Sequence, residues 1–208
     1  MDKQVRTNEL IVAIRSPLHM EERRKAIREA WGKSFTDHGA RVLFVVSGEK
    51  CLTNVELRED VLYTPGSNAH ADLTNRMCHL FAYLQQLSYS HVLVIDDDCS
   101  VNVPLFMSLS WDKFEAWGHN SGGYLSGCAA VFSKKTIEQL NYNMTKDDVV
   151  IGSILTRLGV NMEHAGWPCP VRPWLGPEGD ILSPDVAIQH YVRSPQKIIE
   201  NHLNNKIS

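Results

Sequence analysis

Short continuous apolar runs recur along the first half of the chain. The runs at Glu9–Arg15, Arg41–Val46 and Val92–Ile95 show little polar alternation, which is typical of strands buried on both faces of a sheet. A shorter run at Val61–Tyr63 is followed by Pro65-Gly66, which predicts a further short strand that stops there.

Between these runs the apolar residues fall at helical intervals. Glu21–Lys33 begins with two acidic residues and predicts an amphipathic helix, and Ala71–Leu87 predicts a second one. Strands that alternate with helices predict an α/β fold with a mixed, mainly parallel sheet flanked by helices. In such sheets ligands bind beyond the carboxyl ends of the strands.

The second half of the chain is less regular. A glycine-rich segment beginning at Gly122 runs into a predicted strand, and Ser133–Leu140 predicts a short helix. Thr145–Asp148 has the pattern of a capping box and predicts the start of another helix, which Gly159 ends. Residues 167–179 are rich in proline, so we expect an ordered loop there.

Length and charge limit the kind of protein. The 208 residues fit one compact domain, and the net charge of −3 gives no general attraction to nucleic acid or anionic membranes. No apolar run approaches the roughly 20 residues that span a bilayer, and the first residues lack the apolar core of a signal peptide. Five cysteines without a CxxC pair predict reduced thiols and no structural zinc site. We expect a soluble, cytoplasmic protein of bacterial or viral type; a protein trimmed of a membrane anchor has the same features.

Three consecutive carboxylates, Asp96, Asp97 and Asp98, stand at the end of the apolar run Val92–Ile95. Adjacent like charges at the tip of a buried strand repel one another and are costly to desolvate, which indicates a bound cation with oxygen ligands, such as a divalent metal. Asp96 and Asp98 point the same way on an extended chain. A solvated acidic loop is the alternative.

A second acidic pair, Asp147-Asp148, falls at the predicted start of a helix. Carboxylates there cap the helix and complement its dipole, and the same position keeps a general base ionised, so both roles stay open. His190 follows an apolar stretch, but the sequence holds nine histidines and spacing alone does not select this one.

Three arginines are candidates for holding phosphate: Arg15 at a strand end, Arg28 on the first predicted helix and Arg76 near the start of the second. Solvated or salt-bridged arginines would show the same pattern. Together with Asp96 and Asp97 they make up the expected nucleotide-binding set.

Several segments jointly resemble the β-1,3-galactosyltransferases and their N-acetylglucosaminyl and Fringe relatives. The similarity covers about residues 10 to 165, and its segments occur in that family's order. They are Arg23–Gly32 (RRxAIRxTWG in the family), Asp72–Arg76 (NLTxK), Asp96–Asp98 (the DDD form of the DxD motif), Gly123–Ala129 (YxSGxGY) and Asp147–Gly152 (EDVxxG). Departures include Asp72 for Asn, Arg76 for Lys and Asp147 for Glu.

This resemblance implies a single GT-A-type glycosyltransferase domain over residues 1–208. The nucleotide-sugar half would lie at about 9–100 and the acceptor half at about 101–208. The resemblance further implies a UDP-sugar donor, Mn²⁺ or Mg²⁺ as cofactor, and inversion at the anomeric carbon. It makes Asp98 the principal metal ligand, Asp96 a ligand to metal or nucleotide, His190 a further metal ligand, and Asp148 the general base.

The acceptor stays open. A glycan or lipid-linked saccharide fits, and so does a hydroxymethylated pyrimidine in DNA, modified by a compact phage-type enzyme. Trp167, Trp174 and Asp147 are candidate acceptor contacts, although the tryptophans could equally pin their loop to the core. A non-catalytic nucleotide-sugar-binding module is a further alternative, against which the presence of both Asp98 and Asp148 argues.

Overall fold

The computed structural model describes residues 10–48, 53–67, 69, 72–120, 125–140, 147–164, 171–172 and 185–205. At residues 120, 147–150, 164 and 172 only the backbone is described. The candidate acceptor residues Trp167 and Trp174 lie outside these ranges, as does Thr145 of the expected capping box.

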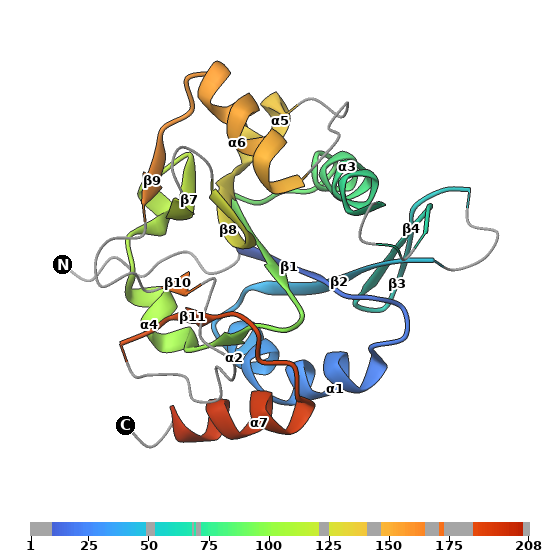
Figure 1. Ribbon diagram of the computed structural model, residues 1–208, viewed down its shortest axis with the longest axis vertical. Helices are drawn as coiled ribbons and strands as arrows, with labels where there is room; N and C mark the ends of the chain where they lie inside the picture. Colours follow the sequence, from blue (N-terminus) through green and yellow to red (C-terminus); the bar gives the residue numbers. More distant parts are fainter. Residues whose placement is uncertain are drawn as a thin grey trace.

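A mixed sheet of eight strands forms the centre of the described fold, in the order β3-β4-β2-β1-β5-β8-β7-β9 (Figure 1). The strands are β1 Leu10–Arg15, β2 Arg41–Ser47, β3 Glu56–Arg58, β4 Val61–Thr64, β5 His91–Asp96, β7 Ala116–Asn120, β8 Leu125–Ser133 and β9 Met162–His164. Neighbours β4, β2, β1 and β5 are parallel, whereas β3 and β8 pair antiparallel with β4 and β5. The carboxyl ends of four adjacent strands therefore meet at one edge.

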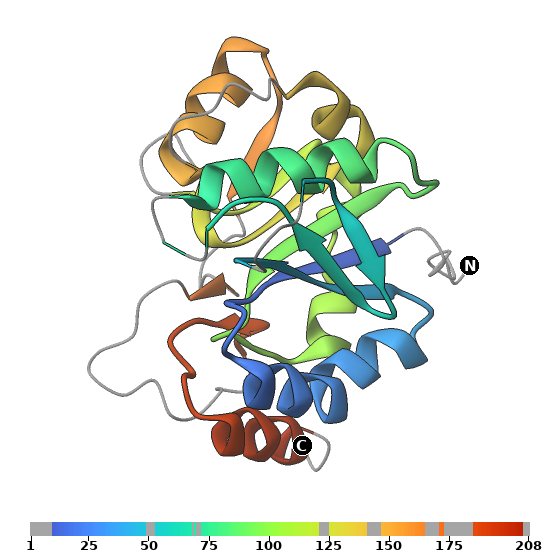
Figure 2. The same ribbon diagram turned by 90° about the vertical axis from the view of Figure 1, so that its right-hand side faces the viewer.

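Helices cover both faces of this sheet (Figures 1 and 2). One face carries α1 Glu21–Glu29, α2 Trp31–Asp37, α4 Val103–Ser108 and α7 Pro195–Asn204. The other carries α3 Leu73–Leu84, α5 Lys134–Gln139 and α6 Asp147–Arg157. A short 3₁₀ helix spans Trp111–Lys113. The expected mixed, mainly parallel α/β architecture is confirmed.

Side chains of the central strands alternate between the two layers. In β1, Leu10, Val12 and Ile14 pack into the cluster that includes α1 and α2, whereas Ile11 and Ala13 pack into the cluster that includes α3 and α6. The same alternation in β5 decides the direction of the aspartates that follow it.

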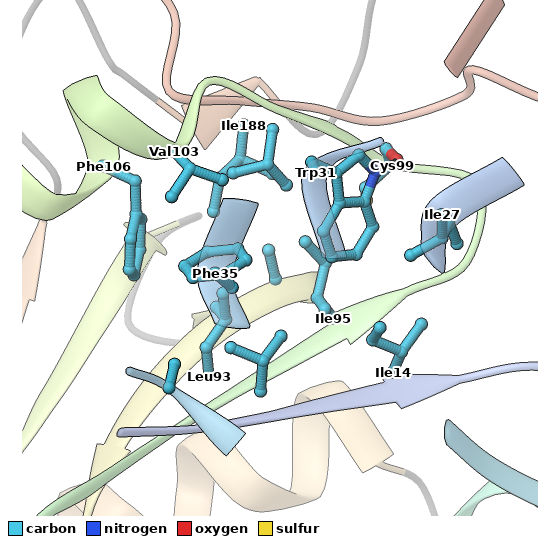
Figure 3. Packing of buried hydrophobic residues seen from close by; sticks show 14 of the residues in the cluster. Ile14, Ile27, Trp31, Phe35, Leu93, Ile95, Cys99, Val103, Phe106 and Ile188 are labelled. Carbon is cyan, nitrogen blue, oxygen red and sulfur yellow. Dashed lines mark hydrogen bonds between the residues drawn. The ribbon is translucent and has the colours of Figure 1, made fainter. Parts of the chain in front are cut away.

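The α1–α2 layer packs directly against the chain that follows the aspartates (Figure 3). Trp31 and Phe35 are fully buried, and the Trp31 indole Nε1 donates to the carbonyl of Cys99 at 3.1 Å. Phe35 meets the ring of Phe106 edge-on, with centroids 5.5 Å apart. These contacts fix the segment after Asp98 to a rigid part of the core.

A small second sheet brings the C-terminal part of the chain to the aspartates. It consists of β6 Ser100–Val101, β10 Val171–Arg172 and β11 Ile188–Gln189. In the antiparallel β11–β6 pair, Gln189 lies opposite Ser100. The residue after Gln189 is therefore carried to the residues just before Ser100.

The strand predictions over 10–15, 41–46, 61–63 and 92–95 are confirmed, and Glu9 of the first one lies outside the described residues. The predicted helix Glu21–Lys33 is wrong in its continuity. It breaks at Ala30, whose φ of −102° and ψ of −118° are not helical, into α1 and α2. Gly32 is required just after the break, because a Cβ there would lie 2.7 Å from the carbonyl oxygen of Ile27. None of the described helices has the length and apolar character of a bilayer span.

Candidate metal centre

Three side chains from distant parts of the sequence converge at the carboxyl edge of the main sheet. We call Asp96, Asp98 and His190 the Asp–Asp–His cluster. Each offers one ligand atom, and these atoms lie within 4.8 Å of one another. His190 Nε2 is 3.0 Å from Asp98 Oδ1 and 3.8 Å from Asp96 Oδ2. The side chains remain partly open to solvent, with 28% of Asp96, 18% of Asp98 and 14% of His190 exposed.

The fold explains this convergence. Asp96 is the last residue of β5 and lies beside Arg15, the last residue of β1. By strand alternation it shares a side with Val92 and Val94, toward α3 and α6. The β11–β6 pairing delivers His190, and the Val192 N–H donates to the Asp98 carbonyl at 2.7 Å.

Asp97 turns away from the cluster and is almost fully buried. Its carboxylate accepts hydrogen bonds from Ser16 Oγ and from Arg23 Nη1, each at 2.7 Å. This direction follows from the same alternation, which sends residue 97 toward the α1 layer. The structure therefore does not bring Asp97 to the expected nucleotide-binding set, because its acceptor oxygens are engaged by α1 and by the end of β1.

The two cluster carboxylates differ in their electrostatics. Burial raises the pKa of Asp96 to about 6; Arg15 opposes this rise, and the charge of Asp98 adds to it. Burial also acts to raise the pKa of Asp98, but the hydrogen bond and charge of His190, with Arg23 and Arg193, outweigh it and lower the pKa. Two like charges so close together favour a cation between them.

Two buried arginines stand next to the cluster. Arg15 Nη2 pairs with Asp96 Oδ1 at 2.9 Å and also donates to the carbonyl of Gly127. Arg76, on the first turns of α3, donates from Nε to Ser47 Oγ at 3.0 Å. Burial, followed by the charge of Arg15, lowers the pKa of Arg76. These two guanidinium groups give the edge a buried positive charge that suits an anion.

Arg28 lies elsewhere, which corrects its expected place in the nucleotide-binding set. It pairs with Asp60 through Nε at 2.7 Å and with Glu21 at 3.1 Å. Asp60 immediately precedes β4, which lies three positions from β5 in the strand order, and the Arg28 guanidinium stacks over Phe44 in the middle of β2. Arg28 is therefore held away from the cluster at the end of β5.

The expected helix with Asp147 and Asp148 exists and begins at Asp147 as α6. In its second turn, Ile151 lines a small cavity of about 20 Å³ together with Arg15, Ser126 and Gly127. The N-terminal half of α6 is thus close to the Arg15 side of the cluster. The roles assigned to the Asp147 and Asp148 side chains stay predictions.

Sequence reasoning missed the supports of the cluster, above all Arg23 and Ser16. Arg24 also belongs to them, since its guanidinium donates to Ser16 Oγ at 3.1 Å. The Arg23-Arg24 pair was visible as the start of the Arg23–Gly32 segment that resembles RRxAIRxTWG. Its signal was a doubled arginine on the first turn of a helix that follows a strand end, opposite a run of three carboxylates.

Comparison with solved structures identifies the fold. One similar structure is a glycosyltransferase involved in the glycosylation of the major capsid of PBCV-1, with a TM-score of 0.50 and 13% identity, covering 96% of this chain and 99% of that one. Another is the galactosyltransferase LgtC in complex with donor and acceptor sugar analogs, with a TM-score of 0.54 and 11% identity, covering 93% of this chain and 95% of that one. At these identities the similarity establishes the GT-A-type fold and not the reaction.

Comparisons of the sequence with known proteins do not assign the chain to a family. No protein-family model matches the chain, and no curated protein sequence matches it. The relation to β-1,3-galactosyltransferases and Fringe proteins is therefore not confirmed and stays a prediction.

Proposed function

We propose that the protein is a metal-dependent glycosyltransferase that moves a sugar from a UDP-sugar to a hydroxyl group of a saccharide. The observation that carries the proposal is the convergence of Asp96, Asp98 and His190 at the carboxyl edge of a GT-A-type sheet. That edge is where α/β sheets bind ligands. The similarity to two glycosyltransferases of the same fold supports the reaction class.

The donor set of the Asp–Asp–His cluster fits a divalent ion such as Mn²⁺. Carboxylate ligands suit Mn²⁺, and an imidazole is compatible with it, whereas metals that prefer thiolate would require cysteine ligands. The charge of Asp98 adds to the burial that raises the pKa of Asp96, and a cation bound between the two carboxylates would relieve that repulsion. A divalent ion bound here would supply charge neutralisation to a diphosphate leaving group.

The remaining residues divide the work of the transfer. Arg15 and Arg76 offer buried positive charge to the diphosphate of the donor. Asp148 takes the proton of the acceptor hydroxyl while the oxygen of that hydroxyl bonds to the anomeric carbon. The bond from that carbon to the diphosphate oxygen breaks at the same time, and its electron pair leaves with UDP. Attack from the opposite face inverts the anomeric centre and needs no covalent nucleophile.

A screen of UDP release tests this proposal. UDP-glucose, UDP-galactose and UDP-N-acetylglucosamine are each offered with Mn²⁺, Mg²⁺ or EDTA, and with oligosaccharides or hydroxymethylated DNA as acceptors. We expect release that requires the metal and is stimulated by a saccharide. Stimulation by the DNA alone would favour the phage-type alternative, and UDP binding without any turnover would favour the non-catalytic module. Equal release in EDTA would contradict the metal assignment.

A further inference from the structure

Arg23 links three parts of the molecule that hold the Asp–Asp–His cluster in place. It lies on the first turns of α1, and its side chain is only 12% exposed. Through Nη1 it donates to Asp97 Oδ1 at 2.7 Å, and through Nη2 to the carbonyl of Arg193 at 3.2 Å. One guanidinium group thus connects the middle aspartate with the segment that follows His190.

The segment that Arg23 holds is strained. Tyr191, directly after His190, has a φ of +67°, in the left-handed region that residues other than glycine rarely adopt. Such conformations persist where the surroundings over-determine them, and they cluster at functional sites. Two contacts hold the backbone on the far side of Tyr191: the Val192 N–H bond to the Asp98 carbonyl, and the Arg23 bond to the Arg193 carbonyl.

The strained turn controls the imidazole. The ring of Tyr191 stacks on His190 with centroids 3.9 Å apart and an interplanar angle of 27°. The Arg193 guanidinium lies over the Tyr191 ring at 5.3 Å from its centroid. A shift of the turn would therefore move the His190 ring relative to Asp98, although Arg23 itself touches neither ligand atom.

The other end of the bridge is rigid. Asp97 is held by Ser16 as well as by Arg23, and its own N–H donates to the carbonyl of Arg15 at 3.0 Å. Arg24 anchors Ser16 and the chain just after it, with Nη1 at 2.6 Å from the Pro17 carbonyl. The geometry of Asp96 and Asp98 is thereby fixed to the same network that Arg23 extends toward His190.

We infer that Arg23 is a positioning residue that sets the distance between the His190 imidazole and the two aspartates, and so the affinity of the cluster for a divalent ion. This inference rests on the proposed metal site and deepens it. Outer partners that orient metal ligands typically alter affinity by about 10–100-fold when they are changed. A guanidinium reaches the two acceptors from two separate nitrogens, whereas the three donors of a lysine ammonium all leave one nitrogen.

The test compares Arg23→Lys with Arg28→Lys. Both arginines lie on α1 and both pair with an aspartate, but Arg28 pairs with Asp60 beside β4, three positions from β5 in the strand order. Binding of Mn²⁺ alone to each protein is measured by electron paramagnetic resonance or calorimetry, and thermal unfolding without metal is followed in parallel. We expect Arg23→Lys to weaken Mn²⁺ binding about 10-fold. Arg28→Lys should leave Mn²⁺ binding unchanged and lose less stability, because the Arg28–Asp60 pair is more exposed than the Arg23–Asp97 pair.

Equal Mn²⁺ affinity of wild type and Arg23→Lys would overturn the inference and leave the metal site standing. Absence of Mn²⁺ binding by the wild type would instead overturn the proposed metal site, and the inference with it. If Arg23→Lys does not fold, Asp97→Asn provides the same test, because it removes the charged anchor that orients Arg23. It too is expected to weaken Mn²⁺ binding, and unchanged binding would count against the inference.

Discussion

Replacement of Asp98 by asparagine is expected to abolish Mn²⁺ binding and Mn²⁺-supported sugar transfer. Asp98 has the shortest contact with His190 in the cluster, at 3.0 Å, and the neutral amide removes a charge that a divalent ion needs. Changes to outer partners already cost about 10–100-fold in metal affinity, so loss of a direct ligand should cost about 100-fold or more. Mn²⁺ titration and UDP release measured on the same preparation check this.

The stability of the apo protein should change little in the same variant. Removal of the Asp98 charge relieves its repulsion of Asp96 but also weakens the interaction with His190 that lowers the pKa of Asp98, so the two effects oppose one another. Wild type should gain thermal stability when Mn²⁺ is added, since a ligand that binds only the folded state stabilises it, and Asp98→Asn should not.

His190→Ala should weaken Mn²⁺ binding less than Asp98→Asn, because the imidazole carries no negative charge. A metal-induced stabilisation that survives in Asp98→Asn would contradict the ligand assignment.

Replacement of Asp148 by asparagine is expected to remove transfer while UDP binding stays within about 2-fold of wild type. The proposal makes this side chain the base for the acceptor proton, and removal of a general base typically costs about 10²–10⁴-fold in rate. This role is compatible with the position of α6, whose N-terminal half lies near the cavity lined by Arg15 and Ile151. Single-turnover transfer rates and calorimetric UDP titrations separate the two quantities.

Asp147→Asn is the matched control. It removes an equal charge from the same helix end, so any effect through the helix dipole should appear in both variants. Because Asp147 is a candidate acceptor contact, we expect Asp147→Asn to keep most of the transfer rate when the acceptor is saturating. Equal loss of rate in both variants, or loss of UDP binding in Asp148→Asn, would point to a capping role for Asp148.

Much of the site edge was predictable because it follows from strand patterning. A buried run that ends in carboxylates places them at the carboxyl edge, and the period of two sends Asp96 and Asp97 to opposite sides. The direction of Asp97 could have been read from that period. The arginine that pairs with Asp97 could not be predicted. Arg23, Arg24 and Arg28 lie in one predicted helix, and only the position of that helix against the strands decides which of them reaches Asp97.

The position of His190 next to the aspartates could not be predicted, because the short strands that bring it there leave no periodic pattern in the sequence. The strands β6 and β11 have two residues each, too few for a hydrophobic pattern, and only their pairing carries His190 to Asp98. The break at Ala30 was hidden for a similar reason, because the apolar spacing continues through it into α2. Gly32 was the local clue in the sequence, because a glycine permits the close approach to the Ile27 carbonyl that the break requires.

The most direct measurement is an anomalous difference map from crystals of the protein grown with Mn²⁺ and UDP. We expect a manganese peak between the carboxylates of Asp96 and Asp98 and Nε2 of His190, with the diphosphate beside it on the side of Arg15 and Arg76. A manganese peak elsewhere, or UDP bound away from these residues, would contradict the proposed site.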